Sequence, residues 1–133
     1  MAYPEDFDEL LLSSKEEFQH LAPKAQVAFC IHALEAEVNN GGFHQFFFNS
    51  SGEYVRETLA ALATVHAPKT RDLLDRAVAV AFPSGYPREA RTHQDALADF
   101  DDVAEALGPL DNQFFAYEEP LADLVNVYLS RDA

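Results

Sequence analysis

The chain has 133 residues, 48% of them hydrophobic, which is enough for one domain with its own core. Its 23 acidic and 9 basic side chains give a formal charge of −14, which disfavours direct binding to nucleic acid or to an anionic membrane and makes basic proteins the natural partners. No apolar run is long enough to cross a membrane, and the acidic N-terminus lacks the regions of a signal peptide. We therefore expect a cytoplasmic protein with a single domain over residues 1–133.

Apolar residues at helical spacing, separated by Pro, Gly and Asn, predict an all-α domain of about six helices. A short acidic segment around Glu5–Leu12 comes first, and Ser14 with Glu17 then forms a capping box. The next helix begins at Pro23 and ends at the Asn-Asn-Gly-Gly of residues 39–42. Cys30 lies in this helix between apolar neighbours; as the single cysteine it excludes an intramolecular disulfide, and we expect a buried structural thiol. Four phenylalanines follow and are expected in the core: Phe43, Phe46, Phe47 and Phe48.

The second half of the chain predicts further helices in the same way. Residues 49–52 lead into a helix with Val55, Leu59 and Leu62 on one face, and His66 falls on that face. Pro68 begins the next helix, which ends at Pro83. A helix is then predicted from Thr92 to about Leu107, ended by Gly108 and Pro109. Its expected core-facing residues are Leu97, Phe100, Ala104 and Leu107. A last helix begins near Pro120, after three expected packing residues, Phe114, Phe115 and Tyr117.

The negative charge is concentrated at the two ends of the chain. Residues 1–23 contain 6 acidic and 1 basic side chains, residues 24–91 contain 7 of each, and residues 92–133 contain 10 and 1. In the predicted helix over 92–107, Asp95, Asp99, Asp102 and Glu105 share one stripe opposite the apolar face. The stripe spans about 15 Å, or about 5 Å per charge, against about 3.4 Å per phosphate along one DNA strand. The predicted partner-binding acids are Asp95, Asp99, Asp101, Asp102, Glu105, Asp111, Glu118, Glu119 and Asp123. Further candidates near the N-terminus are Asp6, Asp8, Glu9, Glu16 and Glu17.

One segment carries a family signature: Glu37-Val-Asn-Asn-Gly-Gly-Phe-His-Gln-Phe-Phe-Phe-Asn-Ser-Ser-Gly52. It resembles the signature of a bacterial family of helical domains that is named for a DNA-mimic protein and is otherwise of unknown function, and the resemblance continues over about residues 30–130. It implies an all-helical fold. For the member that names the family, it implies imitation of DNA charge to occupy a DNA-binding regulatory protein. The fold carries over more safely than the function, because mimicry depends on the placement of surface acids.

The signature residues have a structural and a functional interpretation. In the structural interpretation, which we favour, Asn40 and Gly41 cap a helix, Gly42 permits tight packing, and Gln45 and Asn49 bind backbone groups at helix ends. In the functional one, Asn40, His44, Gln45 and Asn49 converge on a ligand. The signature residues for which we expect a structural role are Asn40, Gly41, Gly42, Phe43, Gln45, Phe46, Asn49 and Gly52.

Binding is the favoured function and catalysis is not expected. No nucleophile elbow, phosphate loop or diagnostic metal spacing occurs, and His32 with Glu35 is a weak metal candidate, so we expect no cofactor or metal. The leading hypothesis is a DNA mimic that occupies the DNA-binding surface of a basic regulator or nuclease. The alternatives are an interaction or immunity-type protein, favoured by an exposed rim of Tyr54, Tyr86 or Tyr117, and an enzyme with a pocket at His44 and Gln45. Acidity as an adaptation to salt also stays open, and a homodimer is compatible with the sequence.

Overall fold

A computed structural model describes residues 18–131, and within them the chain forms six α-helices, three short 3-10 helices and no strand. This confirms the all-α prediction. The predicted Glu5–Leu12 segment, the Ser14–Glu17 capping box and the N-terminal acids lie outside the described residues. The elements, in chain order, are η1 (Phe18–His20), α2 (Pro23–Phe48), η2 (Ser50–Tyr54), α3 (Val55–Thr64), α4 (Pro68–Ala81), η3 (Ala90–Thr92), α5 (His93–Ala96), α6 (Phe100–Phe115) and α7 (Leu121–Ser130).

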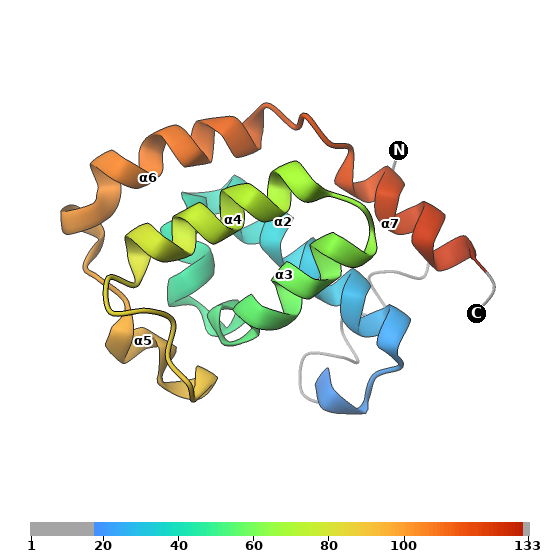
Figure 1. The fold of residues 1–133 in the computed structure, drawn as a ribbon, viewed down its shortest axis with the longest axis horizontal. Coiled ribbons are helices and arrows are strands. Elements are labelled where there is room, and N and C mark those ends of the chain that lie inside the picture. Colours follow the sequence, from blue (N-terminus) through green and yellow to red (C-terminus); the bar gives the residue numbers. More distant parts are fainter. Residues whose placement is uncertain (1–17, 132–133) are drawn as a thin grey trace.

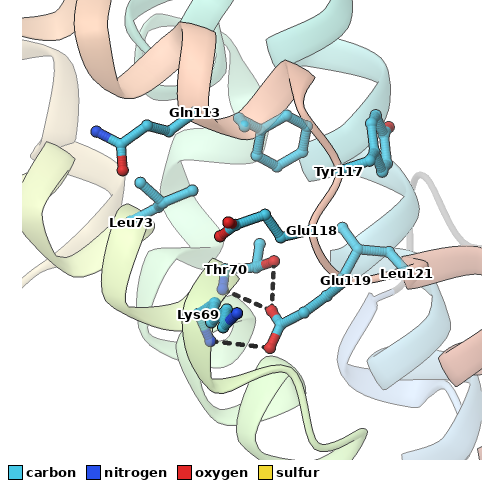
Figure 2. Close-up of a pocket in the computed structure, with 9 residues that line it drawn as sticks. Lys69, Thr70, Leu73, Gln113, Tyr117, Glu118, Glu119 and Leu121 are labelled. Atoms are coloured by element: carbon cyan, nitrogen blue, oxygen red, sulfur yellow. Dashed lines mark hydrogen bonds between the residues drawn. The ribbon is translucent and has the colours of Figure 1, made fainter.

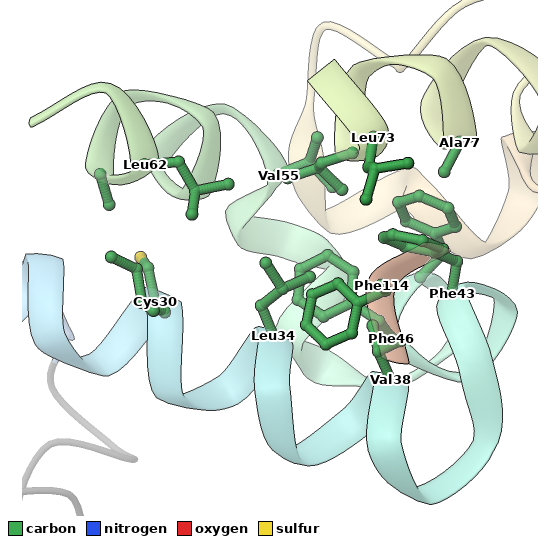
Figure 3. Packing of buried hydrophobic residues seen from close by; sticks show 14 of the residues in the cluster. Cys30, Leu34, Val38, Phe43, Phe46, Val55, Leu62, Leu73, Ala77 and Phe114 are labelled. Atoms are coloured by element: carbon green, nitrogen blue, oxygen red, sulfur yellow. The ribbon is translucent and has the colours of Figure 1, made fainter. Parts of the chain in front are cut away.

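The long helix α2 is the centre of the fold. It contacts α3, α4, α5, α6 and α7, and α4 lies between α3 and α6 (Figure 1). Side chains of α2 such as Leu34 and Val38 meet Val55 of α3, Leu73 of α4 and Phe114 of α6 in one apolar cluster (Figure 3). Cys30 belongs to this cluster at 2% exposure, which confirms the prediction of a buried thiol, and burial raises the pKa of the thiol to about 12. None of the helices within residues 18–131 is long and apolar enough to cross a membrane.

A kink divides α2 where the sequence predicts the helix to end. Gly41 has φ −155° and ψ 15°, and Gly42 has φ 83° and ψ 178°, so the chain leaves the helix there and a second helical arm begins at Phe43. Gly42 lies in the left-handed region that favours glycine. A Cβ atom at Gly42 would also lie 2.6 Å from Oδ2 of Asp111. The kink therefore depends on a bare glycine, and it turns the phenylalanines into the core.

Three of the four phenylalanines in the second arm are fully buried, namely Phe43, Phe46 and Phe47. The prediction is wrong for Phe48, which is 54% exposed. At about 100° per residue, positions 43, 46 and 47 share one face of the arm, whereas Phe48 points roughly 140° away from Phe43. The aromatic run therefore contains one ring that faces outward.

Helices α3 and α4 follow the predicted pattern except at one histidine. Val55 and Leu62 are buried, and α4 begins at Pro68 and ends just before Pro83, as expected. His66, however, is exposed and has φ 64°, because α3 ends at Thr64 and the N–H of Ala67 donates to the carbonyl of Leu62. The prediction that His66 shares the apolar face is therefore wrong.

The predicted continuous helix over residues 92–107 is also wrong. The chain is extended at Leu97 (ψ 130°) and Asp99 (ψ 145°), and this break separates α5 from α6. The N–H of Ala98 donates to the carbonyl of Ala81 (2.9 Å), and Nε2 of His44 lies 2.9 Å from the carbonyl of Ala98. These tertiary hydrogen bonds replace helical ones, and Asp99, a preferred N-cap residue, begins α6.

The end of α6 differs from the prediction as well. Gly108 and Pro109 lie inside the helix, which continues to Phe115. Pro109 removes one helical hydrogen bond, but Leu110 and Phe114 beyond it are buried against the core and hold the last turns in place. Phe100 and Phe115, the first and last residues of α6, are 53% and 46% exposed, contrary to the prediction that both rings pack inside.

Candidate functional site

Five exposed carboxylates form the acidic surface, which we define as Asp95, Asp99, Asp101, Asp102 and Glu105. They lie on α5 and on the N-terminal half of α6. The sequence contains no lysine or arginine between Arg91 and Arg131. Within residues 18–131 none of the five forms an ion pair; the pairs described there are Arg76 with Asp72 and Arg91 with Glu89. Their charge is therefore not compensated by the described part of the chain.

The break before Asp99 changes the geometry of the predicted stripe. Asp95 lies on a separate helix from the other four, so the 15 Å line does not exist. From Asp99 to Glu105 the chain rises only about 9 Å, which is one carboxylate per about 3 Å and close to the 3.4 Å per phosphate of a DNA strand. Asp101, Asp102 and Glu105 lie within about 100° of arc, opposite the buried Val103 and Leu107. The charge is more compact than the sequence indicated.

These acids also suit the end of a helix. Asp101 and Asp102 occupy the first turn of α6, where negative charge interacts favourably with the helix dipole by roughly 0.3–1 kcal/mol per group. Asp99 is the N-cap residue, but its side chain makes no capping hydrogen bond. Asp95 likewise lies in the first turn of the one-turn helix α5. Interaction with a helix dipole therefore applies to three of the five positions and leaves Asp99 and Glu105 without such a role.

The acidic surface is fixed to the second arm of α2. Besides the two hydrogen bonds of Ala98, Nε2 of Gln94 donates to the carbonyl of Phe48 at 2.5 Å. The ring of His93 is 4% exposed and lies between two backbone carbonyl oxygens, with Nδ1 3.0 Å from that of Ala90 and Nε2 3.1 Å from that of Asn49. The α5–α6 junction is thereby joined to the kinked helix.

Two of the other predicted acids hold helices in place. Oδ1 of Asp111 accepts the N–H of Phe43 at 2.8 Å, at the start of the second arm of α2. Burial raises the pKa of Asp111, and the Phe43 bond offsets part of that rise. Glu119 accepts from the N–H of Lys69 (3.0 Å) and from the N–H and hydroxyl of Thr70 (2.7 and 2.8 Å), at the start of α4 (Figure 2). Both carboxylates are internal caps, away from the acidic surface.

The remaining two predicted acids lie near the α6–α7 connection. Glu118 is exposed beside Glu119, and Asp123 is half-buried in the first turn of α7. The structure therefore gathers five of the nine predicted acids on α5 and the N-terminal half of α6. Asp111 lies further along α6, and Glu118, Glu119 and Asp123 lie beyond its end.

A carboxylate that the sequence analysis did not single out organises the signature segment. Glu37 accepts from Nε2 of Gln45 (3.3 Å) and from Nδ2 of Asn49 (2.6 Å), across the kink of α2. The Ser51 hydroxyl lies 3.4 Å from the same carboxylate and donates to the Phe46 carbonyl at 2.9 Å. The prediction that the Gln45 and Asn49 side chains bind backbone groups is wrong, because both donate to Glu37. The sequence feature that could have identified Glu37 is its position as the first residue of the signature segment.

The other signature residues also serve the fold. A Cβ atom at Gly52 would collide with the Phe47 carbonyl, and one at Gly41 would collide with the side-chain oxygen of Gln45. Asn40 is exposed on the first arm, and His44 binds Ala98 instead of joining Gln45 and Asn49. The four polar side chains of the ligand hypothesis therefore do not converge on one point.

A comparison with protein families shows which family the chain belongs to. The family model of DMP19-like proteins matches residues 19–132, which include both the Glu37 cluster and the acidic surface. The chain belongs to the DMP19-like family. That family takes its name from a DNA-mimic protein. Neither the search of curated proteins nor that of solved structures produced a match.

The tyrosines of this DMP19-like protein use their hydroxyls internally. The hydroxyl of Tyr117 donates to Oε2 of Glu35 (2.7 Å) and accepts from Nδ2 of Asn39 (2.8 Å). Burial raises the pKa of Glu35, and it raises the pKa of Tyr117 to about 12. The hydroxyl of Tyr86 donates to the carbonyl of Gly52 at 2.5 Å, and burial raises its pKa to about 12 as well. Tyr54 is half-buried against Phe18 and Phe29.

Of these tyrosines only Tyr117 is exposed, at 38%. A continuous rim of exposed tyrosines, which would favour a protein-specific interface, is therefore absent from the part of the chain that the structure describes. Across residues 18–131 the DMP19-like fold also brings together no group of three or more His, Cys, Asp or Glu side chains that could hold a metal ion. The exposed acids of α5 and α6 are its most distinctive chemical feature.

Proposed function

We propose that this DMP19-like protein binds through its acidic surface to the DNA-contacting surface of a basic nucleic-acid-binding protein and thereby competes with DNA. The protein acts by binding alone and catalyses no reaction. Its partner is a transcription regulator or another protein that carries a Lys/Arg surface shaped for DNA. It acts without direct contact with nucleic acid.

The observation that carries this proposal is the compact charge at the start of α6. Four carboxylates fall within about 9 Å of helix axis, without an ion pair among residues 18–131, at a spacing close to that of phosphates on one strand. The family name, taken from a DNA-mimic protein, agrees with this reading. A partner that binds phosphates with lysines and arginines would find carboxylates at comparable intervals.

The test uses a variant that removes charge without disturbing the helix. In the triple variant Asp99→Asn, Asp101→Asn and Asp102→Asn, the N-cap position keeps a preferred residue. The matched control removes three charges elsewhere, with Glu53→Gln, Glu57→Gln and Asp75→Asn on η2, α3 and α4. Partners are captured from a lysate of the bacterium that encodes the chain, eluted with salt and identified, and the purified partner is then titrated with its DNA.

We expect the protein to weaken the DNA binding of its partner competitively, with an affinity that falls steeply as salt increases. Each carboxylate that pairs with a partner lysine or arginine should contribute roughly 0.5 kcal/mol, so loss of three such ion pairs predicts about tenfold weaker binding for the triple variant. The control should bind with little change. A partner that binds its DNA normally while saturated with this protein would refute competition. That result would instead favour the alternative, in which an acidic protein neutralises a basic partner away from its DNA-binding surface.

A further inference from the structure

Two phenylalanine rings are exposed beside the acidic surface. Phe48 is 54% exposed and Phe100 is 53% exposed. The ring of His44 packs edge-on against Phe100 with 5.4 Å between centroids, and His44 and Phe48 lie one turn apart on the same face of α2. We call Phe48, His44 and Phe100 the aromatic patch. It brings the second arm of α2 together with the start of α6.

Carboxylates flank this patch on the α5–α6 side. Asp99 and Asp101 are the sequence neighbours of Phe100, and Asp95 follows Gln94, whose amide donates to the carbonyl of Phe48. On α6 the ring of Phe100 projects about 100° around the helix axis from Asp101, so the patch adjoins the acidic surface at its Asp99–Asp101 edge. The hydrogen bonds of His44 and Gln94 fix the two sides of the patch relative to each other.

Phosphate imitation alone gives no reason for these rings. A half-exposed phenylalanine leaves on the order of 100 Å² of its surface in water, and aromatic side chains of this kind dominate the energetics of protein interfaces. A partner suited to this surface carries cations around an apolar centre. Recognition helices of DNA-binding proteins have that chemistry, because they present lysines and arginines to DNA together with apolar groups that contact thymine methyls.

We infer that Phe48 and Phe100 form the apolar centre of the interface and receive the apolar side chains that a basic recognition helix presents between its lysines and arginines. This inference rests on the proposed function and specifies the partner surface. It predicts a complex that is less sensitive to salt than one made by charge alone, because the contribution of the two rings is not screened.

The test compares two synthetic helical peptides of equal length and equal positive charge. One peptide carries leucines between its arginines, and the other carries glutamines at the same positions. Affinities for the wild-type protein, for the double variant Phe48→Ala with Phe100→Ala, and for Phe115→Ala are measured by calorimetry at low and high salt. Phe115 is the matched control, because its ring is 46% exposed at the opposite end of α6.

We expect the wild type and Phe115→Ala to bind the leucine peptide at least tenfold more tightly than the glutamine peptide, with the ratio retained at high salt. The double variant should bind both peptides alike, at the wild-type affinity for the glutamine peptide. If the double variant loses helicity, Phe100→Ala alone should still lose part of the ratio.

Equal binding of both peptides by the wild type, or a ratio that survives in the double variant, would overturn the inference. The proposed function would remain intact, because its test is the triple variant that removes three charges from the acidic surface. Failure of both peptides to bind would count against the inference and the acidic interface together. Sedimentation provides a separate check: a wild-type dimer that the double variant converts to a monomer would assign the patch to a second copy and overturn the inference.

Discussion

The clearest test of how the signature segment works is the substitution Glu37→Gln. The Glu37 carboxylate accepts two side-chain hydrogen bonds across the kink of α2, from Nε2 of Gln45 at 3.3 Å and from Nδ2 of Asn49 at 2.6 Å. Glutamine has the same shape but only one acceptor oxygen, and it places an amide donor against the donor groups of Gln45 or Asn49. The substitution therefore removes one charge-assisted bond and leaves one donor without an acceptor.

The expected cost follows from these contacts. A hydrogen bond to a charged group contributes roughly 1.5–3 kcal/mol, so we expect Glu37→Gln to lower the free energy of unfolding by about 2 kcal/mol. An unfolding entropy of about 2.1 cal/mol/K per residue gives about 0.28 kcal/mol/K for the 133-residue chain, so the melting temperature should fall by about 7 °C.

Thermal unfolding followed by circular dichroism measures this effect. The control is Glu105→Gln, which removes the same charge from an exposed position and should change the free energy by less than about 0.5 kcal/mol. If Glu37→Gln shifts the melting temperature no more than this control, the Glu37 cluster does not hold the kink together, and our explanation of the signature is wrong.

Three further predictions address the kink, the pH dependence and the buried thiol. Gly42→Ala should lower the free energy of unfolding in urea by about 2–3 kcal/mol, because φ is 83° and the new Cβ would displace the Asp111 cap. The control Gly108→Ala has open space around the new Cβ and should raise the free energy of unfolding by up to about 1 kcal/mol. Equal effects of the two substitutions would contradict the role of Gly42. Burial raises the pKa of Glu35 in the folded state, so ionisation of this carboxyl opposes folding. The stability of the protein should therefore rise as pH falls from neutral toward the ordinary pKa of 4.5. Glu35→Gln should flatten this increase in melting temperature between about pH 7 and pH 5, and an unchanged slope would argue against a contribution from Glu35. Cys30, with its pKa raised to about 12, should react with Ellman's reagent at about pH 8 only after unfolding, and rapid reaction of the native protein would show that the thiol is accessible.

The sequence predicted those elements whose ends are marked locally. Pro23 and Pro68 begin α2 and α4, and the glycines at 41 and 42 break α2 where expected. Apolar spacing identified Leu34, Leu62 and Leu74 as core residues, because helical periodicity and burial agree in α2, α3 and α4. Local signals were sufficient where no distant residue competed with them.

Tertiary contacts explain what the sequence could not predict. Residues 92–107 have good helical spacing, yet Ala98 makes its hydrogen bonds to Ala81 and His44, and the helix breaks there. The break removes the long acidic stripe that the spacing predicted. The donors that converge on Glu37 likewise come from the far side of the kink, so no spacing rule relates them. Only the fold separates Asp111 and Glu119, which cap helices, from the freely exposed acids of α6.

The double attachment of Ala98 has a consequence for recognition. DNA is stiff on the scale of a protein, so its phosphates are already in position before a protein arrives. Carboxylates on a flexible segment would lose conformational entropy on binding, and part of the attraction would be spent on ordering them. Here the backbone between Asp95 and Asp99 is held by α4 on one side and α2 on the other. The acids therefore project from a preorganised frame, so that binding does not have to order the backbone that carries them.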